Sequence, residues 1–335
     1  MYKHRLIFKT SDNAEIFYLK DTILVKFNIK RNGISTSELN GGSRDLYKSV
    51  FNQHLSQEKI DFLENHDVRD YLVSQCKSFG EDFNFSTGLI TLAKMNNVSI
   101  VVKKYRTIEV TAITTAGVRS NASCAGDPAA YYEEKGKFGT INTIILINAH
   151  LKSYVLAHAL MMATEAKTVA LNNLKIPSQY SNNYATGTGT DGLCIFSNTE
   201  SDNILTNADK HSKLGELISQ AVIESVTKAI GKQVWLTNKS QSHVLVRLNR
   251  YKLDINEFYE NLDSDKFEFI KQLKTDSKKQ DNVAITSSIL NLIDEINLNL
   301  IKKDEALNLA ENIKNKCNSY PVKMLLEHWI NYFIR

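Results

Sequence analysis

The chain has 335 residues, of which 42% are hydrophobic and 23% charged, a composition typical of a globular protein with a substantial core. Its net charge of +4 comes with no basic patch interleaved with aromatic residues, which argues against a nucleic-acid partner. The four cysteines form no C-x-x-C pair, so neither a disulfide scaffold nor a thiolate zinc site is indicated. Without a signal-like N-terminus or an apolar run near the ~20 residues of a membrane span, we expect a soluble cytoplasmic protein.

Hydrophobic periodicity first predicts strands and then helices in the N-terminal part of the chain. Alternating apolar residues predict three short strands, at 4–9, 15–19 and 22–28. Between residues 43 and 78 the apolar spacing becomes helical. Segments 98–102 and 107–115 are rich in β-branched residues and predict a pair of strands.

From residue 140 onward, strands and helices are predicted to alternate. Apolar runs predict buried strands at 141–147 and 193–196. Each is followed by a helical pattern, at 152–174 and at 212–230, and Ser212 is placed to cap the second helix. This order favours an α+β fold with a mixed β-sheet packed with helices.

The composition changes sharply after Gly231, because all fourteen glycines lie at or before that position. We therefore predict two domains, an α/β domain over residues 1–231 and a mostly helical C-terminal extension over residues 232–335. The extension is predicted to contain a strand at 243–248 and helices at 255–262, 266–273, 283–300, 304–315 and 321–333. It carries no site signature of its own.

Two titratable candidates lie in or beside the predicted helices. Glu165 lies in a helix that is apolar nearly all round, where desolvation would raise the pKa of a carboxyl and suit it to proton transfer. His158 lies two turns earlier on the same face. The alternative is a carboxylate that pairs with a lysine or reaches solvent. His211 precedes the helix that carries Glu216, where an imidazole can exchange protons or serve only as a loop or capping residue.

Two loops are rich in small and polar residues. The loop ATGTGTDG, at 185–192, has Asp191 as its one carboxylate, and its N–H groups could cradle an anion or an oxyanion. A tight connection between elements would show the same pattern, and the loop lacks the G-K-[ST] of a P-loop. The loop SNASCAGDP, at 120–128, supplies Asn121, Cys124 and Asp127. Cys124 could be a nucleophile, although free cysteines are more often inert.

Several segments together resemble a known family. The segments TAGVRSNASCAGDPA, GTINTIILIN, ATEAKTVAL, ATGTGTDG and HSKLGELI occur in this order, with ISTSELNGG nearer the N-terminus. They resemble the adenosylcobinamide amidohydrolase family over roughly residues 15–231. The resemblance implies hydrolysis of the amide that joins the aminopropanol arm to the corrin ring, giving adenosylcobyric acid and 1-amino-2-propanol in corrinoid salvage. The corrinoid would then be a substrate and not a cofactor.

Amide hydrolysis needs an activated nucleophile, a stabilised oxyanion and a proton for the leaving amine. We expect Glu165 or His211 to activate water, and Asp191 or Glu216 to orient that base. Substrate contacts are expected at the motif positions Asn121, Asp127, Asn148, Thr164, Thr186, Gly187, Thr188, Gly189 and Thr190. Backbone N–H groups of 186–192, with Asn121 or Asn148, would stabilise the oxyanion.

Several alternatives stay open. Thr164 or Thr188 could be the nucleophile, and a divalent metal could bind through His211, Glu216 and Asp191, although no metal site is assigned. Four tyrosines beside the loops either line a wide corrinoid cleft or lie at the surface, namely Tyr131, Tyr132, Tyr180 and Tyr184. The competing functions are a corrinoid-binding protein without hydrolase activity and a phosphotransferase that uses the Gly/Thr loop. The expected partner is a small-molecule corrinoid, with neither nucleic acid nor membrane, and the chain is compatible with a homo-oligomer.

Overall fold

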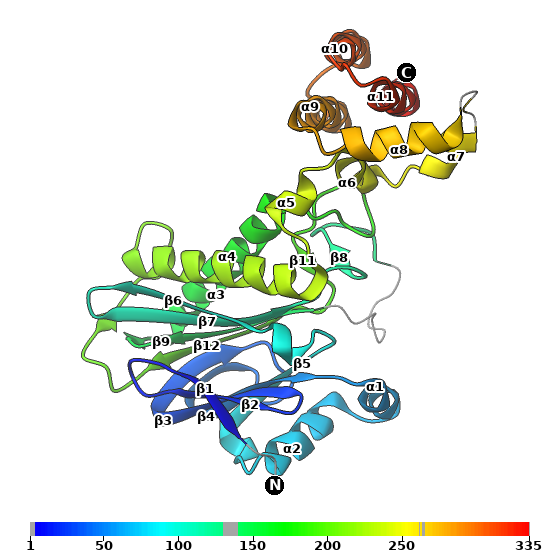
Figure 1. Ribbon diagram of the computed structural model, residues 1–335. Helices are drawn as coiled ribbons and strands as arrows, with labels where there is room; N and C mark the ends of the chain where they lie inside the picture. The colour runs from blue at the N-terminus through cyan, green and yellow to red at the C-terminus, as the bar shows by residue number, and fades with distance from the viewer. Residues whose placement is uncertain (1–3, 130–139, 261, 263–264, 335) are drawn as a thin grey trace. The chain divides into compact units, whose positions relative to one another are not determined.

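The computed structural model describes residues 4–129, 140–260, 262 and 265–334 (Figure 1). The chain divides into two compact units, Met1–Leu236 and Thr237–Arg335. Separate hydrophobic clusters form the cores of the two units. The domain boundary predicted at residue 231 falls inside helix α4 (Lys213–Val234).

Within the described residues, the first unit contains a nine-stranded mixed sheet, which confirms the predicted fold class. Its strands are β1 (Arg5–Lys9), β2 (Glu15–Leu19), β3 (Thr22–Ser35), β4 (Gly42–His54), β5 (Ser86–Thr91), β6 (Ser99–Tyr105), β7 (Ile108–Ala116), β9 (Ile141–Ile147) and β12 (Gly192–Asn198). The main path runs β1-β2-β3-β12-β9-β7-β6, and β4 pairs with both β3 and β5. The pairs β12–β9 and β4–β5 are parallel, whereas the other neighbours are antiparallel.

The sheet curls at β3, which changes partners along its length. The first half of β3 pairs with β2 and the second half pairs with β12, while β4 follows both halves through two register shifts. Such irregularities bend a strand and increase its twist. Aromatic rings fill the inside of the curl, where Phe196 lies 5.0 Å, centroid to centroid, from both Phe27 and Tyr47.

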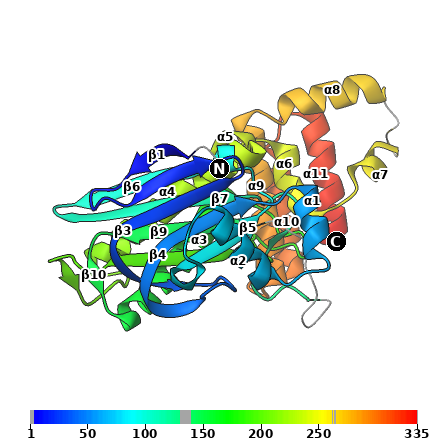
Figure 2. The same cartoon turned by 90° about the horizontal axis from the view of Figure 1, so that it is seen from below.

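Helices cover both outer faces of the curled sheet. Helices α3 (Ser153–Asn173) and α4 pack against each other over β6, β7, β9 and β12 (Figure 1). Helices α1 (Gln57–Leu63) and α2 (Val68–Ser78) lie beside β4 and β5 on the other side (Figure 2). The predicted cap of α4 is confirmed, because Ser212 Oγ accepts the Gly215 N–H at 3.0 Å.

Short elements complete the first unit. They are the strand pairs β8 (Ala122–Ser123) with β11 (Gly187–Thr188) and β10 (His150–Leu151) with β13 (Ile204–Leu205), and the 3-10 turns η1 (Phe83–Phe85) and η2 (Met95–Asn97). The pairing of β8 with β11 joins the two loops that the sequence singled out. Within the described residues, no helix combines the length and the apolar character needed to cross a bilayer.

All the secondary structure among the described residues of the second unit is helical. Its elements are α5 (Asn238–Gln241), α6 (Val244–Leu248), η3 (Asn249–Tyr251), α7 (Ile255–Glu260), α8 (Lys266–Asp276), α9 (Gln280–Asn297), α10 (Lys303–Asn315) and α11 (Tyr320–Phe333). Five of these helices occupy the predicted places, and Pro321 lies in the first turn of α11 as expected.

Two predictions of secondary structure were wrong. Residues 43–54 form β4 and not a helix, because the strand is paired on both sides and its second half is buried on both faces, so its apolar spacing does not alternate. Residues 244–248 form α6 and not a strand, because Val244 and Leu248, four positions apart, are both buried in the helical core. Strand β5 was not predicted at all.

Candidate functional site

Two small cavities meet beside Asp191 and Gly192. The first has a volume of about 130 Å³ and reaches Thr164 and Lys167 of α3; we call it the α3 cavity. The second has a volume of about 220 Å³ and reaches α2; we call it the α2 cavity. Both are lined by Thr36, Asp191 and Gly192, so the two cavities are neighbours.

Asp191 is held by four donors. Its Oδ1 accepts the Thr188 hydroxyl at 2.5 Å and the Ile141 N–H at 3.0 Å. Its Oδ2 accepts the Thr188 N–H at 3.1 Å and pairs with the Lys167 ammonium. The Lys167 and Asp191 side chains are only 18% and 15% exposed, so the pair is well shielded from water. A carboxylate bound in this way is suited to positioning its neighbours, and less suited to abstracting a proton.

Gly187 lies directly against the Lys167–Asp191 ion pair. A Cβ at position 187 would lie 2.4 Å from Asp191 Oδ2 and 2.8 Å from Lys167 Nζ. No side chain can occupy that space while the pair keeps its geometry. A side chain at this position would therefore displace the Asp191 carboxylate or the Lys167 ammonium.

Lys167 was missed by the sequence analysis, although it lies inside the quoted segment ATEAKTVAL. The α3 residues that line the cavity are Leu160, Ala163, Thr164 and Lys167. Their spacing of three and four positions marks one face of a helix. That spacing was the signal that could have identified Lys167 in place of Glu165, which points away from this face.

The segment after β3 brings two further side chains to the cavities. Thr36 lines both of them, and its hydroxyl accepts the Leu193 N–H at 2.9 Å, which leaves its own proton for a bound molecule. Glu38 lines the α2 cavity. Glu38 is exposed to solvent, and some desolvation together with the negative charge of Asp67 raises the pKa of its carboxyl. Neither residue was among the predicted site residues.

Three of the four predicted catalytic residues lie outside both cavities. Glu165 is 46% exposed and forms an ion pair with Lys210 at 2.5 Å, so the expected desolvation of its carboxyl is wrong. His211 is exposed before α4, and its N–H donates to Asp209. Glu216 is exposed and binds Lys213 at 2.5 Å. Only Asp191 of the four lines a cavity, so the predicted convergence of Glu165, His211 and Asp191 in one pocket is not found.

Several predicted substrate-binding residues instead hold the loops together. Buried Asn121 accepts the Tyr180 hydroxyl at 2.9 Å, and its amide lies against Gly189. Asp127 accepts the Cys124 N–H at 2.7 Å and the Ser178 hydroxyl at 2.5 Å. These contacts join the loop around residue 121 to the segment that leads into the Gly/Thr loop.

The predicted oxyanion cradle is already partly bonded within the protein. The Thr186 N–H donates to the Ser123 carbonyl, and the Thr188 N–H donates to Asp191. Among the predicted threonines, Thr164 lines the α3 cavity and Thr190 lines the α2 cavity. The Thr164 hydroxyl donates its proton to the backbone carbonyl of Leu160. A carbonyl oxygen is not a base that could activate this hydroxyl as a nucleophile.

Asn148 lies at the wrong end of β9. Its side-chain Oδ1 accepts the Glu109 N–H at 2.7 Å, whereas Ile141, which contacts Asp191, begins the same strand. Seven residues of strand place the two ends about 20 Å apart. Asn148 therefore cannot share a small pocket with Asp191. Of the tyrosines considered, Tyr131 and Tyr132 lie outside the described residues.

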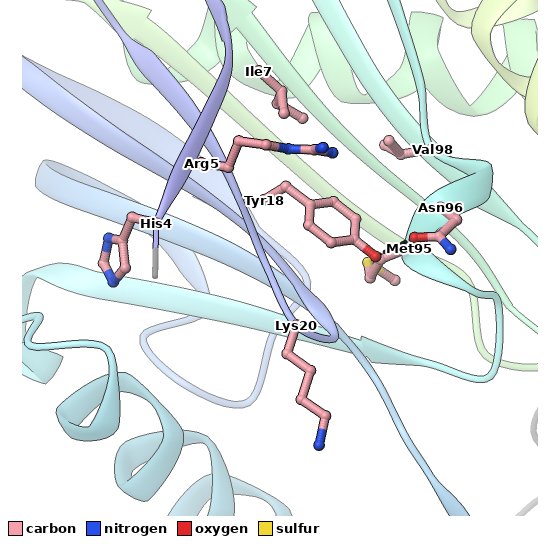
Figure 3. A pocket seen from close by; sticks show the side chains of 8 residues that line it. All are labelled: His4, Arg5, Ile7, Tyr18, Lys20, Met95, Asn96 and Val98. Carbon is pink, nitrogen blue, oxygen red and sulfur yellow. Dashed lines mark hydrogen bonds between the residues drawn. The ribbon is translucent and has the colours of Figure 1, made fainter. Parts of the chain in front are cut away.

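The described residues contain no group of three or more His, Cys, Asp or Glu side chains arranged to hold a metal ion. The ligand set considered from the sequence, which was His211, Glu216 and Asp191, is therefore not assembled here. A larger cavity of about 800 Å³ lies at the edge of the sheet beside β1, β2 and η2, where Tyr18 binds Asn96 (Figure 3). It contains none of the residues of the quoted segments.

Comparison with known proteins identifies the family. A sequence model of the adenosylcobinamide amidohydrolase family matches residues 7–238. The chain belongs to this family. An adenosylcobinamide amidohydrolase of Methanosarcina mazei is 29% identical over 219 residues, which cover 63% of this chain and 94% of that protein. An uncharacterized protein of Methanocaldococcus jannaschii is 33% identical over 228 residues, which cover 63% of this chain and 86% of that protein.

The solved structure of the PH0078 protein of Pyrococcus horikoshii matches 69% of this chain and 84% of that protein's chain, with 14% identity and a TM-score of 0.32. The match to the adenosylcobinamide amidohydrolase family contains every residue that lines the two cavities. It also ends close to the boundary of the first unit. The residues of the second unit from 239 onward lie outside the family match.

Proposed function

We propose that the protein hydrolyses the amide that joins the aminopropanol arm of adenosylcobinamide to the corrin ring. The products would be adenosylcobyric acid and 1-amino-2-propanol, and the role would be corrinoid salvage. The observation that carries the proposal is the family match over residues 7–238, which contains the paired cavities around Asp191.

The cavities suit the arm of the substrate and not its macrocycle. Pockets that enclose a whole drug-sized ligand have volumes of roughly 300–1,000 Å³. The α3 and α2 cavities, at about 130 and 220 Å³, are each smaller than this range. A short amide arm fits such a space, and the corrin ring would remain outside against the protein surface.

Lys167 supplies positive charge where an amide hydrolase needs it. Attack on the amide carbon places negative charge on the carbonyl oxygen, and a fixed cation in a shielded site stabilises that charge. The ammonium group has three N–H donors. One of them points to Asp191, so others can reach a carbonyl oxygen in the α3 cavity. The Thr36 hydroxyl adds a neutral donor that faces both cavities.

The test is incubation of the purified full chain with adenosylcobinamide in the absence of ATP. Free 1-amino-2-propanol, detected by mass spectrometry after derivatisation, together with the matching corrinoid acid, would support the proposal. The variant Lys167→Met is expected to lose at least ~100-fold in kcat, the scale of losing one oxyanion donor. The matched control is Lys210→Met, because Lys210 is an exposed lysine outside both cavities.

Other results would identify another function. Tight corrinoid binding without release of the amine would indicate a binding protein. A product that forms only with ATP would indicate a phosphotransferase.

A further inference from the structure

The site described above has the Lys167 cation, the Thr36 hydroxyl and the Asp191 carboxylate, whose oxygens already accept four hydrogen bonds. Amide hydrolysis also needs a group that transfers protons. We propose that Glu38 is this group, and that the scissile amide lies beside Asp191 and Gly192, where the two cavities meet. This inference rests on the proposed hydrolase function and assigns the general base and acid within it.

Glu38 is carried by a segment that the protein holds firmly in place. Ser37 Oγ donates to the Gly88 carbonyl at 2.5 Å and accepts the Leu39 N–H at 3.0 Å. The Leu39 side chain is fully buried. Asn40 donates to the Phe83 and Ser86 carbonyls at 2.6 and 2.7 Å. The backbone on both sides of Glu38 is therefore fixed, as a catalytic position requires.

Among the described residues, the Glu38 carboxylate has no bonding partner. Within the part of the chain that the structure describes, no hydrogen bond or ion pair to this carboxylate is found, whereas Asp191 has four donors and Glu165 has Lys210. Glu38 nevertheless lines a cavity together with Thr36, Ser37 and Asp191. An unpaired acid on a rigid segment at a cavity is available to a substrate and to water.

The electrostatic surroundings of Glu38 favour proton transfer. Some desolvation raises the pKa of the Glu38 carboxyl although Glu38 is exposed, and the negative charge of Asp67, at the N-cap of α2, raises it further. Asp191 is the other charged residue that lines the α2 cavity, and its charge is offset by Lys167. A carboxyl with a raised pKa works closer to neutral pH, both as a base and as an acid.

The reaction balances with Glu38 and one water. The carboxylate takes a proton from water as the water oxygen bonds to the amide carbon, and the carbonyl oxygen becomes an oxyanion. The protonated carboxyl then gives that proton to the amide nitrogen, and the carbon–nitrogen bond breaks as the oxyanion collapses. The acid and the amine leave, and Glu38 returns to its ionised form.

The decisive variants are Glu38→Gln and Asp67→Asn in the full chain. Glu38→Gln is expected to lower kcat at least ~100-fold, the usual scale for losing an acid–base group, while the Kd for adenosylcobinamide and the Tm stay unchanged. Glu58→Gln, an exposed glutamate of α1, is the matched control. Asp67→Asn keeps an N-cap side chain for α2 but removes the negative charge, so the acid limb of the kcat/KM–pH profile should move to lower pH.

The outcomes separate this proposal from the proposed function. If the wild-type chain releases 1-amino-2-propanol and Glu38→Gln does so at a similar rate, Glu38 is not the proton-transfer group, although the hydrolase function stands. An acid limb that does not move in Asp67→Asn would also overturn the assignment. If the wild-type chain releases no amine, the hydrolase function fails and this inference falls with it.

Discussion

The substitution Gly187→Ala tests whether the Lys167–Asp191 pair organises the site. The added Cβ would lie 2.4 Å from Asp191 Oδ2 and 2.8 Å from Lys167 Nζ. An ordinary van der Waals contact begins at 3.4 Å, so the carboxylate oxygen must retreat by about 1 Å. Alanine introduces no charge and no polar atom, and the substitution therefore perturbs the geometry alone.

The size of the effect follows from the bonds that this oxygen makes. Oδ2 pairs with Lys167 and accepts the Thr188 N–H at 3.1 Å, and a shift of 1 Å would break at least one of these contacts. A hydrogen bond to a charged group contributes about 1.5–3 kcal/mol to stability. For a unit of this size, such a loss lowers Tm by about 3–12 °C. A misplacement of about 1 Å in the catalytic geometry can also cost roughly 100-fold in rate.

The matched control is Gly117→Ala. A Cβ at position 117 meets no atom within 4 Å, and this glycine precedes the same Asn121 loop. Alanine there is expected to leave the Tm unchanged or slightly raised, because it reduces the freedom of the unfolded chain. Both variants would be compared by thermal unfolding and by amine release from adenosylcobinamide. Equal Tm and equal kcat/KM for Gly187→Ala and Gly117→Ala would refute the claim that the ion pair is tightly packed and essential.

Three further predictions address other parts of the chain. Glu165→Gln should keep kcat/KM close to the wild-type value and change the free energy of unfolding by less than ~1 kcal/mol, because its pair with Lys210 is exposed; a 100-fold loss of activity would restore Glu165 to the mechanism. Arg250→Met should lower the stability of the second unit by about 1–3 kcal/mol in urea unfolding, because Arg250 is buried and bonds both oxygens of Asp294. Iodoacetamide at pH 8 should label Cys124 before the three buried cysteines. The labelling should be slow, because partial burial and the charge of Asp127 raise the pKa of the Cys124 thiol. If labelling abolished amine release, the position of Cys124 outside the cavities would be contradicted.

Local sequence signals were sufficient for much of the fold. Strand β9 has the predicted ends, 141 and 147, because every residue in it is apolar or buried and the strand lies at the centre of the sheet. Ser212 and Pro321 mark helix starts through their own backbone chemistry, which needs no tertiary information. Strand β4 could not be predicted in this way, because its burial depends on partners on both sides that are distant in sequence.

The site was harder to predict because the sequence of helix α3 gives little information about which of its faces points toward the sheet. Apolar residues surround most of this helix, because Tyr154, Met161 and Val169 are exposed while eight other residues form one broad buried face. The sequence therefore does not indicate which face meets the sheet and which meets the cavity. Glu165 stood out as a lone carboxylate in an apolar run, but a two-residue offset along a helix turns a side chain to nearly the opposite side. Lys167, two positions later, lies at the cavity.

The quoted segments also combine two kinds of residue that the sequence does not separate. Asn121 and Asp127 bind the loops to each other, and their removal would loosen the site without removing a reacting group. Thr188 lies between these two kinds of residue. Its hydroxyl and its N–H both donate to Asp191, which in turn pairs with Lys167. Such supporting contacts fix the orientation of the groups that touch a substrate. A distinctive sequence pattern in this chain therefore indicates where the candidate site lies, whereas our proposal that Glu38 and Lys167 act there depends on the contacts of their side chains, which the pattern does not show.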